Sequence, residues 1–209
     1  MENTYLENNN VSIAGFVLGE LEFSHMIYGE KFYLFKLSVP RLSENSDIIN
    51  ITISERFFSS VTPKEGDIVS ISGQFRSYNN YKDIGSRLIL TVFVKSIEYI
   101  SSIDDVLNPN QIYLNGYVCK PPIYRTTPFS REIADILLAV NRSYNKSDYI
   151  PCIAWGRNAK YAETLSVGAN LQIRGRIQSR EYQKKISDDE FETKTAFEVS
   201  VSKMEEIQL

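Results

Sequence analysis

Aromatic and basic residues alternate with apolar residues in two segments of the C-terminal half, 149–155 and 171–182. Successive side chains of a β-strand point to opposite faces, so the alternation predicts two strands with one buried and one exposed face each. The set predicted to face the core is Ile150, Cys152, Ala154, Leu171, Ile173, Gly175 and Ile177. The set predicted to face outward is Tyr149, Pro151, Ile153, Trp155, Gln172, Arg174, Arg176, Gln178, Arg180 and Tyr182.

A surface that combines aromatic rings with cations suits single-stranded nucleic acid. Every base offers a flat face that stacks on an aromatic ring for ~1–3 kcal/mol, while cations contact the phosphates. Stacking requires no particular base, so both DNA and RNA are possible ligands. The basic residues of the C-terminal half that we assign to this surface are Arg125, Arg131, Arg142, Arg157, Arg174, Arg176, Arg180 and Lys184.

The charge balance differs between the two halves of the chain. The 209 residues include 23 Lys and Arg against 26 Asp and Glu, a net charge of −3. The first 107 residues hold 9 of the basic and 14 of the acidic residues, whereas the remainder holds 14 and 12. Local clustering decides what a surface attracts, so the C-terminal half is the half predicted to bind an anionic polymer.

Few residues offer catalytic or metal-binding chemistry. His25 is the only histidine, so a histidine-based triad has no partner motif. Cys119 and Cys152 lie 33 positions apart without a CxxC motif or companion histidines. Glycine-rich phosphate loops are missing as well. We therefore predict no enzymatic activity, no metal and no cofactor.

The composition is that of a folded, strand-rich protein. Hydrophobic residues make up 43% of the chain and aromatic residues 12%, mainly 13 Tyr and 11 Phe. Aromatic and β-branched residues favour strands. No apolar run is long enough to cross a bilayer, and the first ten residues, MENTYLENNN, are polar rather than a signal peptide. We expect a mostly-β cytoplasmic protein without a membrane partner.

The two halves of the chain repeat one another. Four segments of the first half match four segments of the second half in the same order, at offsets of 101 to 107 positions. Four blocks in register indicate a tandem repeat. We predict an N-terminal domain over residues 1–103 and a C-terminal domain over residues 104–209. The matching segments are 11–17 with 112–118, 37–47 with 138–148, 65–77 with 167–179 and 92–98 with 199–205.

Each copy shows five predicted strands and one segment of different character between the third and fourth, residues 54–61 and 156–165. In the second copy, Ala159, Ala162 and Leu165 are spaced like the buried face of a short helix. Five strands with a short helix between the third and fourth is the plan of an OB-fold barrel. The predicted fold class is all-β, with two tandem five-stranded OB-fold barrels, each with a short helix between strands 3 and 4.

The C-terminal copy resembles the bacterial single-stranded DNA-binding protein (SSB) family along nearly its whole length. The resemblance is carried by NQIYLNGYV (110–118), AVNRSYNKSDYIPCIAWGRNAKYAE (139–163) and VGANLQIRGRIQSREY (167–182). It implies a protein that coats single-stranded DNA in replication, recombination or repair, with a nucleoid-associated location. The family stacks bases at four aromatic positions, which the resemblance places here at Tyr144, Tyr149, Trp155 and Tyr182.

The N-terminal copy resembles the family more faintly. Its first three stacking positions hold Ser43, Ile48 and Ser54, and Tyr78 is a candidate for the fourth. We therefore expect this copy to bind DNA less strongly. The residues of this copy assigned to the DNA-binding surface are Arg41, Arg56, Arg76 and Tyr78.

The resemblance also implies an assembly. SSB proteins typically combine four OB domains, so a chain with two such domains is expected to form a homodimer. The family usually carries a flexible tail with an acidic, hydrophobic tip that recruits other proteins. The present sequence stops at VSKMEEIQL after its last predicted strand, so recruitment through such a tail is not expected.

Two other functions remain open at this point. The acidic N-terminal copy, poor in aromatic residues at the stacking positions, favours a tandem-OB protein-interaction module of primosome-like or architectural type. Binding to RNA rather than DNA is compatible with any stacking surface. An enzyme on an OB barrel is the weakest alternative, because it would require clustered carboxylates.

Overall fold

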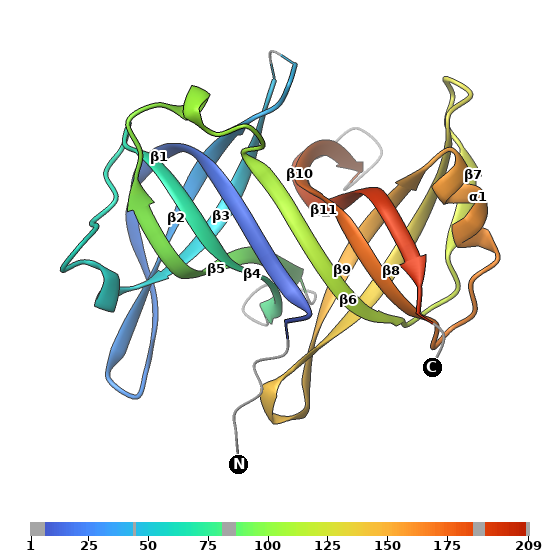
Figure 1. Cartoon of the computed structure of the whole chain (residues 1–209), viewed down its shortest axis with the longest axis horizontal. Helices are drawn as coiled ribbons and strands as arrows, with labels where there is room; N and C mark the ends of the chain where they lie inside the picture. Colours follow the sequence, from blue (N-terminus) through green and yellow to red (C-terminus); the bar gives the residue numbers. More distant parts are fainter. Residues whose placement is uncertain (1–6, 44, 81–86, 186–190, 208–209) are drawn as a thin grey trace.

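The computed structural model describes residues 7–43, 45–80, 87–185 and 191–207, and it contains two closed β-barrels (Figure 1). In the N-terminal barrel, β1 pairs with both β2 and β4, which closes the ring in the order β1–β2–β3–β5–β4. Its strands are β1 (Asn9–Ile27), β2 (Glu30–Pro40), β3 (Ser46–Ser54), β4 (Ile68–Asn80) and β5 (Arg87–Tyr99).

The C-terminal barrel closes in the equivalent order, β6–β8–β9–β11–β10, because β6 pairs with both β8 and β10. The predicted fold class, all-β with two five-stranded OB-fold barrels, is confirmed. One additional short strand, β7 (Ile123–Thr126), pairs with the edge of β8 and was not predicted. The other strands are β6 (Asn110–Val118), β8 (Glu132–Arg142), β9 (Lys146–Trp155), β10 (Asn170–Lys185) and β11 (Phe191–Glu206).

The connection between the third and fourth strands differs between the barrels. In the C-terminal barrel it contains the α-helix α1 (Arg157–Glu163), which buries Ala159 and Ala162. In the N-terminal barrel the predicted short helix is reduced to one 3-10 turn, η1 (Glu55–Phe57). The difference follows from composition, because alanine, lysine and glutamate favour a helix more than the phenylalanines and serines of SERFFSSV.

The predicted alternation places most core residues correctly. All seven inward positions except Gly175 are among the buried residues, with exposed fractions of at most 2%. Two positions predicted to face outward are also buried. Gln178 donates to Glu198 Oε1 (2.6 Å) across the β10–β11 pair, so its polar end is satisfied by a neighbouring strand. Ile153 pairs with Asp135 on β8 and with Ser200 on β11. Asp135 accepts a hydrogen bond from Arg125, and Ser200 accepts one from Trp155, so each neighbour of Ile153 is bound to a larger side chain.

The two barrels share one continuous sheet. β1 and β6 run antiparallel, with pairs from Asn9–Leu114 to Ile13–Asn110, and lie side by side at the centre of Figure 1. Two flanking backbone hydrogen bonds extend this pairing. The connection from β5 to β6 includes the 3-10 turn η2 (Ile103–Asp105), and the predicted boundary between residues 103 and 104 falls within that turn.

Glycines lie at points where neighbouring strands of each barrel approach closely. A Cβ on Gly175 would lie 2.2 Å from the carbonyl oxygen of Ser200, and one on Gly73, its counterpart in the repeat, 2.4 Å from that of Phe93. Neither contact can be relieved without moving backbone.

We expect Gly175→Ala to lower the free energy of unfolding by ~1–3 kcal/mol, as overpacking of a closed core does. Urea denaturation followed by circular dichroism measures this loss. Gly73→Ala should show a loss of the same size, and unchanged midpoints for both variants would contradict the close approach.

Candidate nucleic-acid interface

A buried carboxylate joins the two barrels at one end of their interface. Asp47 of β3 is fully buried and accepts hydrogen bonds from Arg41 Nε (2.8 Å) and Arg176 Nη1 (2.9 Å). It also accepts one from the backbone nitrogen of Ser179 (2.9 Å), whose hydroxyl accepts from the backbone nitrogen of Ile48 (3.0 Å). Arg176 and Ser179 belong to β10, so the carboxylate links β3 of one barrel to β10 of the other.

The repeat places a second carboxylate at the opposite end of the interface. Asp148 is fully buried and accepts from the backbone nitrogen of Ser77 (2.8 Å) and from Arg142 Nη1 (3.3 Å). The Ser77 hydroxyl accepts from the backbone nitrogen of Tyr149 (2.7 Å), as Ser179 does from Ile48. The other oxygen of Asp148 has no hydrogen-bond partner among the described residues, and burial raises the pKa of this carboxyl.

Arg76 lies at the same end, and its hydrogen-bonding capacity is only partly used. Its guanidinium carbon lies 4.1 Å from the centroid of the Phe93 ring, and its Nη2 donates to Gln74 Oε1 (2.8 Å). Its Nε is buried without a partner among the described residues. Burial, together with the positive charge of Arg142, lowers the pKa of Arg76 to about 10. An anion would satisfy the spare donor and the charge together.

These groups line a cleft of about 670 Å³ between the barrels, here termed the basic cleft. It lies where the β8–β9 hairpin of the C-terminal barrel meets β4 and β5 of the N-terminal barrel. Its carboxylate among the described lining residues is Asp148. Its cations are Arg56, Arg76, Lys95, Arg142 and Lys146, and its aromatic residues are Phe93 and Tyr144.

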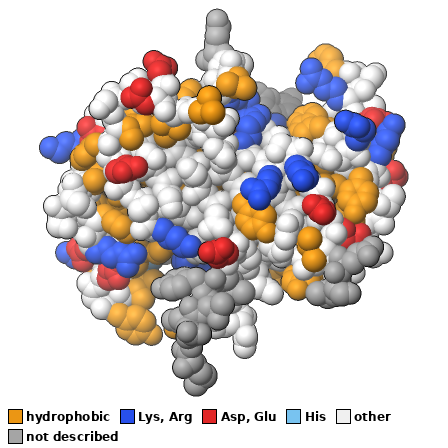
Figure 2. All heavy atoms as spheres, in the orientation of Figure 1, with side chains coloured by type: hydrophobic (Ala, Val, Ile, Leu, Met, Phe, Trp, Pro, Cys, Tyr) orange, Lys and Arg blue, Asp and Glu red, His pale blue; other side chains and the backbone are white. Residues whose placement is uncertain are grey.

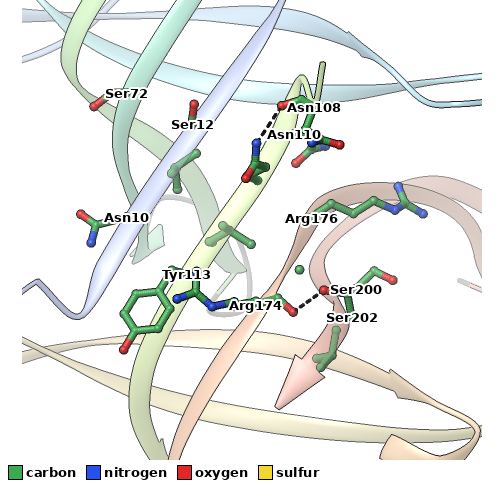
Figure 3. A pocket seen from close by; sticks show the side chains of 15 residues that line it. Asn10, Ser12, Ser72, Asn108, Asn110, Tyr113, Arg174, Arg176, Ser200 and Ser202 are labelled. Atoms are coloured by element: carbon green, nitrogen blue, oxygen red, sulfur yellow. Dashed lines mark hydrogen bonds between the residues drawn. The ribbon is translucent and has the colours of Figure 1, made fainter. Parts of the chain in front are cut away.

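A second surface, here termed the C-terminal wall, crosses β9, β11, β10 and β6 through Trp155, Ser200, Arg174 and Tyr113. The indole nitrogen of Trp155 donates to Ser200 Oγ (3.2 Å). The guanidinium of Arg174 lies over the Tyr113 ring, 5.0 Å from its centroid. Arg174, Tyr113 and Ser200 line a hollow of about 710 Å³, and Figure 3 shows Arg174 and Tyr113 pointing toward one another within it.

The hollow continues onto β1 with uncharged polar side chains. Asn10 and Ser12 form its side toward the N-terminal barrel (Figure 3). Much of the centre of the face shown in Figure 2 is backbone or side chains that are neither charged nor hydrophobic, and Lys and Arg side chains lie over both barrels. The C-terminal wall therefore offers aromatic rings and a cation, and the hollow beside it adds the hydrogen-bonding side chains of β1.

The four aromatic residues at the predicted stacking positions all reach solvent. The exposed fractions are 93% for Tyr144, 48% for Tyr149, 37% for Trp155 and 39% for Tyr182. Tyr144 is held in the left-handed backbone region, with φ of 62°, at the turn of the β8–β9 hairpin. Tyr149 and Trp155 are six residues apart on β9, which corresponds to about 20 Å at ~3.3 Å per residue. The rings are thus spread along a path rather than gathered in one pocket.

The β10–β11 hairpin carries Tyr182, with the Arg180 guanidinium 5.9 Å from its ring centroid. Arg180 also pairs with Glu198 at 3.9 Å, so its charge is partly compensated. The side chain of Lys184 lies outside the described part of the chain. This hairpin therefore adds one ring and one shared cation to the surface.

Three of the predicted cations lie around the β7–β8 hairpin and the start of α1. Arg125 forms a salt bridge with Asp135 (2.9 Å) and is half-exposed. Arg131 and Arg157 are exposed and have no salt bridge among the described residues. These two arginines remain available to an anion.

The sequence predicted few aromatic residues on the DNA-binding surface of the N-terminal copy. The structure adds one aromatic and one basic residue to that surface. Phe93 and Lys95 both follow the outward parity of β5, and both line the basic cleft. Tyr78 is 42% exposed one residue after Ser77, and burial of its ring raises its pKa. Tyr113 was missed in the C-terminal copy. The alternation of inward and outward side chains along β5 would have identified Phe93 and Lys95, and the same alternation along β6 would have identified Tyr113.

No group of three or more His, Cys, Asp or Glu side chains in the described part of the protein is placed to hold a metal ion. Glu132 instead binds Lys160 (2.9 Å) and accepts from the Tyr124 hydroxyl (2.9 Å). No helix among the described residues is long and apolar enough to span a membrane.

Comparison with solved structures gives the same class of fold for both barrels. The wild-type single-stranded DNA-binding protein from Thermus aquaticus superposes with a TM-score of 0.70, over 96% of this chain and 93% of that one, at 18% identity. A deletion mutant of the same protein gives 0.69 over 96% and 95%, at 19% identity. The chain is therefore a tandem OB-fold protein.

Sequence comparison identifies the family. The model of the single-strand binding protein family matches residues 109–207. Single-stranded DNA-binding protein 1 of Staphylococcus aureus is 37% identical over 81 residues, covering 35% of this chain and 48% of the relative. Single-stranded DNA-binding protein B of Bacillus subtilis is 35% identical over 81 residues, covering 35% and 72%. The chain belongs to the single-strand binding protein family, and it spans about half the length of the staphylococcal relative.

Proposed function

We propose that this protein binds single-stranded DNA without catalysis, coating exposed strands in replication, recombination or repair. Bases stack on the aromatic residues of the C-terminal barrel, and arginines and lysines contact the phosphates. The names of the relatives and the family membership support the ligand. The structural observation that carries the proposal is that all four aromatic residues at the family's stacking positions are solvent-facing.

The cations divide into two groups in this proposal. Arg41 and Arg176 hold the buried carboxylate of Asp47, so their role is to fix the barrels relative to one another. Arg174, Arg131 and Arg157, which have no salt bridge among the described residues, are the phosphate-contacting candidates of the C-terminal barrel. If about four contacts form, the logarithm of affinity falls with the logarithm of salt concentration at a slope of about −3.

We expect poly(dT) to quench the fluorescence of Trp155 at low salt and high salt to reverse the quenching. Trp155 is the only tryptophan, and its indole is partly exposed, so the signal reports on this site alone. A fluorescence titration measures it. Circular dichroism of the same samples confirms that the fold is intact, and an intact protein without quenching would contradict the proposal.

One observation favours the second function, a protein-interaction module. The β1–β2 hairpin of the N-terminal barrel carries a group of exposed apolar side chains, including Phe23 (61%) and Met26 (60%), with Tyr28 at its tip. Exposed apolar patches of this kind mark protein contacts. Protein partners that co-purify while oligonucleotides do not bind would favour this function over DNA binding.

The remaining properties are proposals that depend on DNA binding. A homodimer would give four OB domains, a two-fold arrangement that is the commonest symmetry. A cytoplasmic, nucleoid-associated location follows from the ligand. DNA is proposed over RNA, and competition between matched DNA and RNA oligonucleotides distinguishes the two.

A further inference from the structure

The repeat creates two clefts at the junction of the barrels, and they differ in charge. The basic cleft lies at the end of the interface that holds Asp148. Its counterpart, here termed the linker cleft, lies at the Asp47 end and has almost the same volume, about 680 Å³ against about 670 Å³. Figure 1 shows the β5–β6 connection at one end of the junction and the β8–β9 hairpin at the other.

The β5–β6 connection accounts for part of the difference between the two clefts, because it lines only one of them. Residues 103 to 109 form one side of the linker cleft and bring the apolar side chains of Ile103 and Leu107 and the carboxylate of Asp104 to it. The basic cleft has no equivalent segment in its described lining, because only Asn8 and Asn9 border it at that position. The linker therefore covers one cleft, whereas no segment among the described residues covers the other in this way.

The two clefts also differ in the balance of cations and carboxylates that line them. The two cations that line the linker cleft, Arg41 and Arg176, both bind Asp47, and Asp104 adds a further negative charge. The five cations of the basic cleft face one carboxylate. At two of these five positions the other copy of the repeat has an uncharged residue: Lys95 corresponds to Ser202, and Lys146 corresponds to Asn45.

Most of the basic cleft's positive charge is unpaired. Lys95, Lys146 and Arg56 are exposed and form no salt bridge with any described residue. Arg76 has a buried donor without a partner, and Arg142 shares Asp148 with the backbone of Ser77. A cleft that holds several like charges beside low-dielectric walls attracts an anionic polymer strongly.

We propose that a single DNA strand passes between the two barrels through the basic cleft and not through the linker cleft. The strand enters from the Tyr144 and Lys146 side of the C-terminal barrel and continues past Arg76 and Lys95 onto the N-terminal barrel. The chain thus has one crossing point instead of the two that its repeat would allow. This inference rests on the proposed function.

The test compares short and long oligonucleotides on one pair of variants. An OB fold occupies ~4–16 nucleotides, so (dT) of about 8 residues stays on one barrel, whereas (dT) of about 30 must cover both. Each phosphate contact contributes about 0.7 to the salt slope for single strands. For Lys95→Gln/Lys146→Gln we expect the slope on the long oligonucleotide to fall by about 1.4, with a markedly smaller change on the short one.

Two controls isolate the cleft. Lys64→Gln/Lys120→Gln removes the same charge from exposed positions outside both clefts, and Asp104→Asn changes the linker cleft; neither is expected to alter the slope on the long oligonucleotide. An unchanged slope for Lys95→Gln/Lys146→Gln, or an equal loss on both lengths, would overturn the crossing. A wild-type protein that binds neither length would instead refute DNA binding itself.

Discussion

Replacing Tyr149 and Trp155 together with alanine is expected to weaken binding of single-stranded DNA by ~2–6 kcal/mol. Each ring offers one stacking surface worth ~1–3 kcal/mol. The two residues lie six positions apart on β9, so their contributions should add. Because the double variant has no tryptophan, anisotropy of a labelled (dT) oligonucleotide, rather than intrinsic fluorescence, measures the affinity.

A matched control separates stacking from a general loss of aromatic surface. Tyr28 and Tyr161 are exposed but lie outside both clefts and the C-terminal wall, and their replacement with alanine should leave the affinity unchanged. Phenylalanine at positions 149 and 155 should retain most of the binding. Equal affinities for the wild type and the Tyr149→Ala/Trp155→Ala variant would show that bases do not lie on these rings.

Asp47→Ala is expected to lower the free energy of unfolding by ~3–5 kcal/mol. The substitution leaves Arg41 and Arg176 without their shared carboxylate and removes the acceptor of the Ser179 backbone, and loss of one partner of a buried ion pair costs this much. Urea denaturation followed by circular dichroism provides the measurement. Asp148→Ala should cost less, because one oxygen of Asp148 already lacks a partner among the described residues.

Asp105→Ala is the appropriate control for this effect. Asp105 is exposed in the connection between the barrels and forms no salt bridge with a described residue, so its removal should change stability by less than ~0.5 kcal/mol. Similar losses for Asp47→Ala and Asp105→Ala would argue against a structural role for the buried carboxylate.

Much of the fold could be predicted from local pattern. Alternation identified the inward set on β9 and β10, because one buried face forces a two-residue period on a strand. The internal repeat then predicted that the other half of the chain forms a second barrel of the same kind. The extra strand β7 escaped prediction because it has only four residues, none of them buried, so it shows no alternation between buried and exposed positions.

Some members of the candidate site could be named from the sequence, but their arrangement could not. The four aromatic residues were found because each lies at a family position, and all are exposed. The role of Arg176 was not found, because its carboxylate partner is 129 positions away and meets it only when the two barrels pack together. A β-bulge leaves Ser202 of β11 without a partner opposite the step from Arg174 to Gly175, so the buried positions of β11 change from Val199 and Val201 to Met204, which simple alternation cannot anticipate.

The strand pairing between β1 and β6 is formed within a single polypeptide. Two separate barrels joined by one such pairing would come apart on dilution, because their association depends on concentration. A covalent tether of ten residues, from Ile100 to Pro109, raises the effective concentration of one barrel at the other's edge. The two-barrel unit therefore persists at any dilution, and concentration can regulate only contacts between different chains.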